Sequence, residues 1–281
     1  MSCPYFFINK ENIVDNSIFI SGNDYNHLVR VLRTKTGDTV EVSDNESRRY
    51  SASVAEIRKE KAVLLINEIR NISRSYPQIT LFLCILKKDT MEYAIQKTAE
   101  IGIDEIAPVF SRRVVVELGS SKIEGRISRW QNIAEAASKQ CMRDFECRVL
   151  DAVKINAVNP SLFDIFFIPL ESKILNKDHI SLAELDYFLK SSRDKCENES
   201  GEDKGAAGGK KDKYKYRIKK DLKKIGYIIG PEGGFEDNEV EMLLKKGAVP
   251  INFGKNILRS ETASIYFLSV LDYIFKTLNA E

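Results

Sequence analysis

The sequence predicts an α/β protein in two parts, a small β-rich domain followed by a larger domain of alternating strands and helices. Residues 1–72 hold short apolar runs separated by turn residues, a pattern typical of a small β domain. From residue 73 onward, longer apolar runs alternate with stretches of helical period. The polar stretch "NISRSYP" separates the two patterns, so we expect domains at 1–72 and 73–281.

Five strand signals fall in the first domain: "PYFFI", "SIFIS", "DTVEVSD", "RRYSASVAEI" and "KAVLLINEI". One helical stretch, "NDYNHLVRVLR", interrupts them, and its Leu28, Val31 and Leu32 are spaced to form one apolar stripe. Short strands around one short helix predict a β-barrel-like domain.

The second domain contains five buried strand signals: "ITLFLCIL", "DEIAPVF", "LFDIFFIPL", "IGYIIG" and "AVPINFG". Helical stretches separate them, including "TMEYAIQKTAEIG", with Met91, Ala94, Ile95 and Thr98 inward, and "RISRWQNIAEAASKQCMR". This alternation predicts a mainly parallel sheet. The last helix, "ETASIYFLSVLDYIFKTL", is apolar nearly all round, which favours a place in the core or in an oligomer interface.

Residues from about 190 to 224 interrupt this pattern, because they are polar, glycine-rich at the centre and basic at the end. They contain too little apolar surface to form a core, so we interpret them as a flexible insertion. An alternative is a basic arm that touches nucleic acid, since Tyr214 and Tyr216 alternate with basic residues.

The charge balance limits the partners that the chain as a whole attracts. Its 281 residues hold 43 Lys and Arg against 41 Asp and Glu, so binding to nucleic acid requires a local basic surface. No apolar run approaches the roughly 20 residues that cross a bilayer, and the start has no leader pattern. Five cysteines without a CxxC pair, and only two histidines, give no support to a metal site. We expect a cytoplasmic protein without membrane or metal.

The turn "GPEGG", between an apolar strand and a helix, is the first candidate for chemistry. It has neither the Gly-Lys-Ser/Thr ending of a phosphate loop nor the GxGxxG of a dinucleotide site. Its glycines allow backbone to approach a flat ligand, whereas Glu232 disfavours a phosphate. The alternative is a strained turn without a ligand.

A second stretch, "FGKNILRSETAS", also lies between a strand and a helix. Ordinary capping explains it in part, with Ser260 as the N-cap and Arg259 paired to Glu261. A third strand end supplies Leu170 and Glu171. Because open α/β sheets bind ligands beyond the carboxyl ends of their strands, the three stretches together predict a ligand site.

Together "IGPEGGF" and "LRSETA" resemble the signature of SPOUT-class RNA methyltransferases, and the nearest match is the RsmE family. "HLVRVLRTKTGD" resembles the N-terminal, PUA-like RNA-binding domain of that family. "KTAEIGIDEIAPV" and "RWQNIAEAASKQCMR" resemble the first half of its catalytic domain. Ser260 stands where the family commonly has Thr, which keeps the hydroxyl, and the 190–224 insertion is long for the family.

The resemblance implies a PUA-like barrel followed by a SPOUT-type α/β domain with a C-terminal trefoil knot, working as a homodimer. It also implies methyl transfer from S-adenosyl-L-methionine (SAM) to ring nitrogen 3 of a uridine in 16S ribosomal RNA, either naked or in the small ribosomal subunit. Its cofactor loops correspond to Leu170, Glu171, Ile229, Gly230, Pro231, Glu232, Gly233, Gly234, Phe253, Gly254, Ile257, Leu258, Arg259, Ser260, Thr262 and Ala263.

Methylation of this nitrogen requires loss of its proton, so the site needs a base, or a cation that stabilises the uridine anion. The candidate catalytic residues are Arg143, Glu232, Arg259 and Glu261. The candidate RNA-binding residues are His27, Arg30, Arg33, Gln140 and Arg143. Plain surface charge for Arg30 and Arg33, and a solvated helix flank for Gln140, are the alternatives.

Two other functions stay open. The same class of enzyme methylates ribose 2′-hydroxyls, but the Asn–Arg pairing expected early in such a catalytic domain is not found in this sequence. A non-catalytic RNA-binding assembly factor is the other alternative, and the intact Gly230–Gly234 and Leu258–Ala263 stretches weigh against it.

Overall fold

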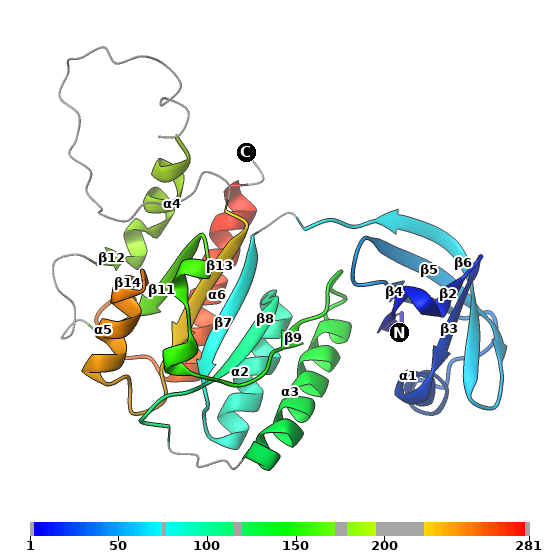
Figure 1. The fold of residues 1–281 in the computed structure, drawn as a ribbon. Coiled ribbons are helices and arrows are strands. Elements are labelled where there is room, and N and C mark those ends of the chain that lie inside the picture. Colours follow the sequence, from blue (N-terminus) through cyan, green and yellow to red (C-terminus); the bar gives the residue numbers. More distant parts are fainter. Residues whose placement is uncertain (1–2, 75–76, 115–119, 172–178, 195–221, 279–281) are drawn as a thin grey trace. The chain divides into compact units, whose positions relative to one another are not determined.

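A computed structural model describes residues 3–74, 77–114, 120–171, 179–194 and 222–278 (Figure 1). The chain divides into two compact units. Unit 1 comprises residues 1–74 and 134–147, and unit 2 comprises residues 75–133 and 148–281.

Unit 1 is built on a six-stranded sheet in the order β1-β4-β5-β6-β3-β2. Its strands are β1 (Tyr5–Phe7), β2 (Ile13–Val14), β3 (Ser17–Ser21), β4 (Thr39–Ser43), β5 (Arg48–Ile57) and β6 (Lys61–Asn71). Only the β1–β4 pair is parallel among these strands, and β5 bulges twice against β6. Bulges increase the local twist, which lets the sheet curl around one apolar core, as Figure 1 shows.

The helical stretch of unit 1 differs from its prediction. Helix α1 (Gly22–Asn26) continues into a π-type turn (His27–Val31), and Arg33 follows with a φ of 55°. Leu28 is fully buried, but Val31 and Leu32 are 65% and 42% exposed. The predicted apolar stripe is therefore wrong beyond Leu28, because a π-type turn rotates each residue less than an α-helix does.

Unit 2 contains a parallel sheet in the order β10-β8-β7-β13-β11-β14-β12, with β9 beside β8. Its strands are β7 (Gln78–Cys84), β8 (Glu105–Phe110), β9 (Arg148–Val149), β10 (Val153–Lys154), β11 (Ile165–Pro169), β12 (Ile180–Ser181), β13 (Lys224–Ile229) and β14 (Val249–Asn252). The predicted mainly parallel α/β sheet is confirmed, while the trefoil knot stays a prediction.

The helices are α2 (Lys88–Ile101), α3 (Ser120–Gln140), α4 (Leu185–Asp194), α5 (Asp237–Lys245) and α6 (Ser260–Leu278). Phe167 on β11 packs edge-on against Phe267 of α6, whereas the next residue back, Phe166, packs in one cluster with Val240 and Leu243 of α5. Since neighbouring strand residues point to opposite faces, α5 and α6 cover opposite faces of the sheet. In the described part of the chain, no helix is long and apolar enough to cross a membrane.

Three helix predictions have different outcomes. In α2, Met91, Ala94, Ile95 and Thr98 are all buried, as predicted. In α6, Tyr273 is 70% exposed, so one side of this apolar helix is open in the single chain. Helix α4 occupies the start of the predicted 190–224 insertion, because Leu185, Phe188 and Leu189 are buried and anchor it. Residues 195–221 of that prediction lie outside the described residues.

Candidate active site

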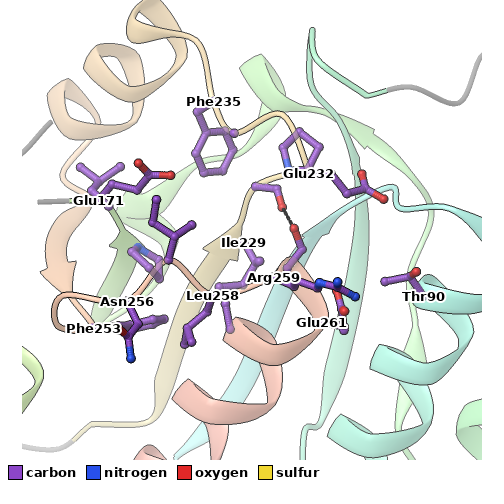
Figure 2. Close-up of a pocket in the computed structure, with 18 of the residues that line it drawn as sticks. Thr90, Glu171, Ile229, Glu232, Phe235, Phe253, Asn256, Leu258, Arg259 and Glu261 are labelled. Carbon is purple, nitrogen blue, oxygen red and sulfur yellow. Dashed lines mark hydrogen bonds between the residues drawn. The ribbon is translucent and has the colours of Figure 1, made fainter. Parts of the chain in front are cut away.

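Three loops meet at the carboxyl ends of the adjacent strands β11, β13 and β14. They enclose a pocket of about 590 Å³, which lies within the range of about 300–1,000 Å³ usual for small-molecule sites (Figure 2). The residues lining it are Lys87, Thr90, Pro169, Leu170, Glu171, Ile229, Gly230, Pro231, Glu232, Gly234, Phe235, Val240, Phe253, Gly254, Lys255, Asn256, Ile257, Leu258, Arg259, Ser260, Glu261 and Ala263.

Hydrogen bonds tie the three loops to one another. The Ser260 hydroxyl donates to the Gly230 carbonyl at 2.7 Å, which joins the loop after β14 to the loop after β13 (Figure 2). The backbone N–H of Leu170 donates to the Ile251 carbonyl at 3.0 Å, and the Asn252 amide donates to the Leu170 carbonyl at 3.4 Å. The pocket walls are therefore one connected structure.

The first of these bonds corrects the predicted capping. Helix α6 starts at Ser260 itself, so the N-cap position belongs to Arg259. The Ser260 side chain is turned away from its own helix toward Gly230. A hydroxyl near a helix start is consistent with either use, because a serine can bond its own helix end or a neighbouring chain segment.

The glycines of the loops serve close packing and turning of the backbone. A Cβ on Gly230 would lie 3.1 Å from the Phe235 ring, which is tighter than an ordinary contact. Gly234 and Gly254 have φ values of 69° and 110°, in the region that favours glycine. Backbone thus forms the pocket wall at these glycine positions.

Several charged side chains border the pocket. The Glu232 carboxylate accepts a long hydrogen bond of 3.4 Å from the backbone N–H of Lys87, at the N-cap of α2. Figure 2 shows Arg259, Glu261 and Thr90 on one side of the pocket. Within the described ranges, neither the Arg259 guanidinium nor the Glu261 carboxylate has an ion-pair partner, so the predicted Arg259–Glu261 pair does not form.

The structure brings together every predicted cofactor residue except Gly233 and Thr262, which do not line the pocket. That these residues hold a cofactor stays a prediction. The sequence reasoning missed Lys87 and Thr90, although they follow β7, the strand next to β13. The rule that used the ends of the other strands applies to this strand equally and would have found them.

The predicted RNA-binding residues lie in unit 1. His27, Arg30 and Arg33, at the π-type turn, are exposed, as is Gln140 near the end of α3. Arg143 is half-buried. The structure gives these positions, and the RNA contacts themselves stay predictions.

The backbone around Arg143 is anchored by side chains of the N-terminal strands. Its carbonyl accepts a hydrogen bond of 2.5 Å from the Tyr5 hydroxyl, and the Ser43 hydroxyl donates to the Asp144 carbonyl at 2.6 Å. Arg49 donates to the Met142 carbonyl at 3.3 Å. Burial raises the pKa of Tyr5 to about 12, so the phenol keeps its proton and remains a donor. Three successive carbonyls are thus held in place.

No cluster of three or more metal-ligating side chains occurs among the residues with described positions. Cys84 is fully buried, and burial raises the pKa of its thiol to about 12. A thiol that stays protonated is a poor nucleophile and a poor metal ligand. The polar side chains that line the pocket are three carboxylates, two lysines, an arginine, an asparagine and two hydroxyls: Glu171, Glu232, Glu261, Lys87, Lys255, Arg259, Asn256, Thr90 and Ser260.

Comparison with known proteins identifies the family of the chain. An RNA methyltransferase domain matches residues 74–272, and an RNA methyltransferase PUA domain matches residues 20–67. A ribosomal RNA small subunit methyltransferase E of Mesomycoplasma hyopneumoniae is 28% identical over 94% of this chain and 96% of its own. Its namesake from Bacillus subtilis is 26% identical over 99% and 98%.

A solved structure of similar fold is the ribosomal RNA small subunit methyltransferase E of Neisseria gonorrhoeae, bound to S-adenosyl methionine. It superposes with a TM-score of 0.72 at 22% identity and covers 97% of this chain and 98% of its own. The matched domain spans most of the chain and includes all three pocket loops. The chain therefore belongs to the RNA methyltransferase family represented by ribosomal RNA small subunit methyltransferase E.

Proposed function

We propose that the protein transfers a methyl group from SAM to ring nitrogen 3 of a uridine in 16S ribosomal RNA. The observation that carries this proposal is that the "GPEGG" and "LRSETA" loops join in one pocket of a chain that belongs to an RNA methyltransferase family. The names of the relatives support ribosomal RNA of the small subunit as the substrate, and the Neisseria structure supports SAM. We also place the reaction in the cytoplasm.

The chemistry of the pocket fits this cofactor. SAM combines a flat adenine and a ribose diol with a charged amino-acid arm on a sulfonium. Side chains such as Leu170, Ile229 and Leu258 offer apolar surface for a flat ring. Glu171 and Glu232 offer carboxylates for hydroxyl or cationic groups. Because Gly234 and Gly254 have no side chain, backbone N–H and C=O groups can approach the ligand.

When bound, SAM supplies an electrophilic methyl group on a positively charged sulfur. The protein has to position the uracil ring and remove the proton from its nitrogen 3. We assign anion stabilisation to Arg259, which is exposed at the pocket and has no ion-pair partner in the described chain. We propose Glu261 as the base that accepts the proton of nitrogen 3, since the other candidate, Glu232, already accepts a backbone hydrogen bond.

The RNA is held by unit 1 in this proposal. Arg30 and Arg33 bind phosphates, with His27 exposed on the same turn, and Gln140 and Arg143 contact the RNA further along. Because the backbone at Arg143 is anchored, its side chain can contact the RNA from a fixed position. We also propose that Arg143 takes part in the reaction. The open side of α6, with Tyr266 and Tyr273, is the surface we propose for a homodimer.

Three measurements test the proposal. Calorimetry should show heat of SAM binding, and purified small subunits or 16S RNA should gain 3-methyluridine by nucleoside mass spectrometry. No heat with folded protein would refute the cofactor assignment. Finding 2′-O-methylated nucleosides instead would keep the enzyme class and replace the target atom, and light scattering at the mass of one chain would refute the homodimer.

A further inference from the structure

The outer side of the loop that follows β13 is fastened to a segment far away in the sequence. Arg112 and Arg113, which follow β8, contact this loop and the start of α5 at three points. The inner side of the same loop, including Gly230, Glu232 and Phe235, lines the pocket. The loop is therefore fixed by contacts to residues that do not line the pocket, directly beside the loop residues that form the pocket wall.

Glu239, in the first turn of α5, is the centre of this attachment. One oxygen of its carboxylate accepts the backbone N–H of Arg112 at 2.9 Å, and the other accepts the backbone N–H of Glu236 at 2.9 Å. The residue is only 4% exposed. Its two oxygens thus join the segment after β8 to the end of the pocket loop.

Two further contacts hold the loop itself. Arg113 donates from Nη1 to the Gly233 carbonyl at 3.1 Å, and a Cβ on Gly233 would lie 3.4 Å from Cβ of Arg113. The Arg112 guanidinium lies 3.6 Å from the Glu236 carboxylate, but it is 70% exposed and contributes little. Within the loop, the Gly234 N–H donates to the Pro231 carbonyl at 2.9 Å, and because Gly233 has no side chain to pack, the Arg113 contact is what holds its carbonyl from outside the loop.

A buried carboxylate is a costly way to stabilise a fold, since well-packed apolar residues usually serve as well or better. Its advantage is that two directed hydrogen bonds fix the positions of the atoms they join. A wall that a cofactor contacts through backbone needs such fixed positions, because loss of preorganisation weakens binding.

We propose that Glu239 and Arg113 are positioning residues that hold the Gly230–Phe235 wall in its cofactor-binding form. This inference rests on the proposed function, because it takes SAM as the ligand. Neither residue lines the pocket. They act through the loop, so their loss should weaken SAM binding while leaving the chemical step intact once the pocket is filled.

The test compares three variants by calorimetry with SAM and by steady-state kinetics. Glu239→Gln replaces one acceptor oxygen by an N–H₂ group, so one of the two bonds is lost. We expect its Kd for SAM to rise about tenfold, and kcat at saturating SAM to stay within about twofold of the unsubstituted protein. Arg113→Ala should raise the Kd about fivefold. Glu241→Gln is the matched control, since Glu241 lies on the same helix, is exposed and, among the described residues, forms an ion pair only with Lys245, at 3.3 Å.

Hydrogen exchange separates positioning from general destabilisation. In Glu239→Gln, the amides of residues 232–236 should exchange faster, whereas those of β13 and α6 should keep their rates. Unchanged SAM affinity in both Glu239→Gln and Arg113→Ala would overturn the inference, as would a fall in kcat without a change in KM. If Glu239→Gln fails to fold, Arg113→Ala decides. If the unsubstituted protein does not bind SAM, the proposed function fails, and the exchange rates alone decide whether Glu239 orders the loop.

Discussion

Replacing Ser260 by alanine removes a side-chain hydrogen bond that joins the two signature loops. The hydroxyl donates to the Gly230 carbonyl at 2.7 Å, and Ser260 is only 8% exposed. Such a bond contributes about 1 kcal/mol net, and the partner left without a donor adds to the cost. We therefore expect Ser260→Ala to lower the free energy of unfolding by about 1–2 kcal/mol. The separated loops should also bind SAM about fivefold to tenfold more weakly.

Two assays test this prediction. Denaturant unfolding is monitored with a spectroscopic probe in unit 2, and SAM affinity is measured by calorimetry. Ser260→Thr is the control, because it keeps the hydroxyl and should retain most of the stability and the affinity. An alanine variant that matches the unsubstituted protein within about 0.3 kcal/mol, with unchanged affinity, would show that the bond does not hold the loops together.

Three further predictions test other parts of the structure. Gly226→Ala places a Cβ 2.4 Å from the Phe166 ring, so it should lower the free energy of unfolding by about 1–3 kcal/mol. Its control, Gly125→Ala, has nothing within 4 Å of the added Cβ and should raise the free energy of unfolding by about 0.5–1 kcal/mol through α3. Equal melting temperatures for the two variants would contradict this prediction. At saturating SAM, Arg259→Ala should lower kcat at least about a hundredfold, and an active variant would exclude Arg259 as the anion stabiliser. Asp44 contributes stability that falls away in acid: burial opposes ionisation, but the backbone N–H groups of Arg48, Ser47 and Glu46 outweigh it and hold its pKa below the usual 3.8. Because the pKa of Asp44 is lower in the folded than in the unfolded protein, this contribution is complete above about pH 4 and is lost as the pH falls through the folded pKa. Asp44→Asn should therefore lose less stability than the unsubstituted protein over that acidic range. Parallel curves of unfolding free energy against pH for the two proteins would refute the assignment.

The sequence predicted the parallel sheet because buried strands and helices differ in length and period. The pocket followed from a topological rule, since residues after neighbouring parallel strands meet at one edge. The same rule covers Lys87 and Thr90, which follow β7, but their residue types alone do not distinguish them from ordinary helix-start residues. The Glu239 attachment was equally hidden, because Glu239 and Arg112 are 127 positions apart and their contact depends on packing.

Local exceptions explain the remaining errors. Val31 and Leu32 have the spacing of a buried stripe, but the π-type turn ends the regular helical period before them. Ser260 is a favourable N-cap by residue type, yet it lies one position inside the helix, where its hydroxyl donates to the Gly230 carbonyl. The end of helix α4 was included in the predicted 190–224 insertion because residues 190–194 are polar in type, whereas the buried residues that anchor the helix, Leu185, Phe188 and Leu189, precede them.

The positive φ angles of Gly234 and Gly254 have a consequence for how this pocket tolerates change. Where main-chain atoms form the wall, as at these two glycines, it is indifferent to many side-chain replacements nearby, because those replacements leave the peptide groups where they are. Positions such as Asn256 and Ile257, which are exposed in their loop, can therefore differ between proteins that hold the same molecule. The constraint concentrates at the few positions where any Cβ would force the backbone into another shape. A short run of glycines thereby encodes the outline of the site more durably than its side chains do.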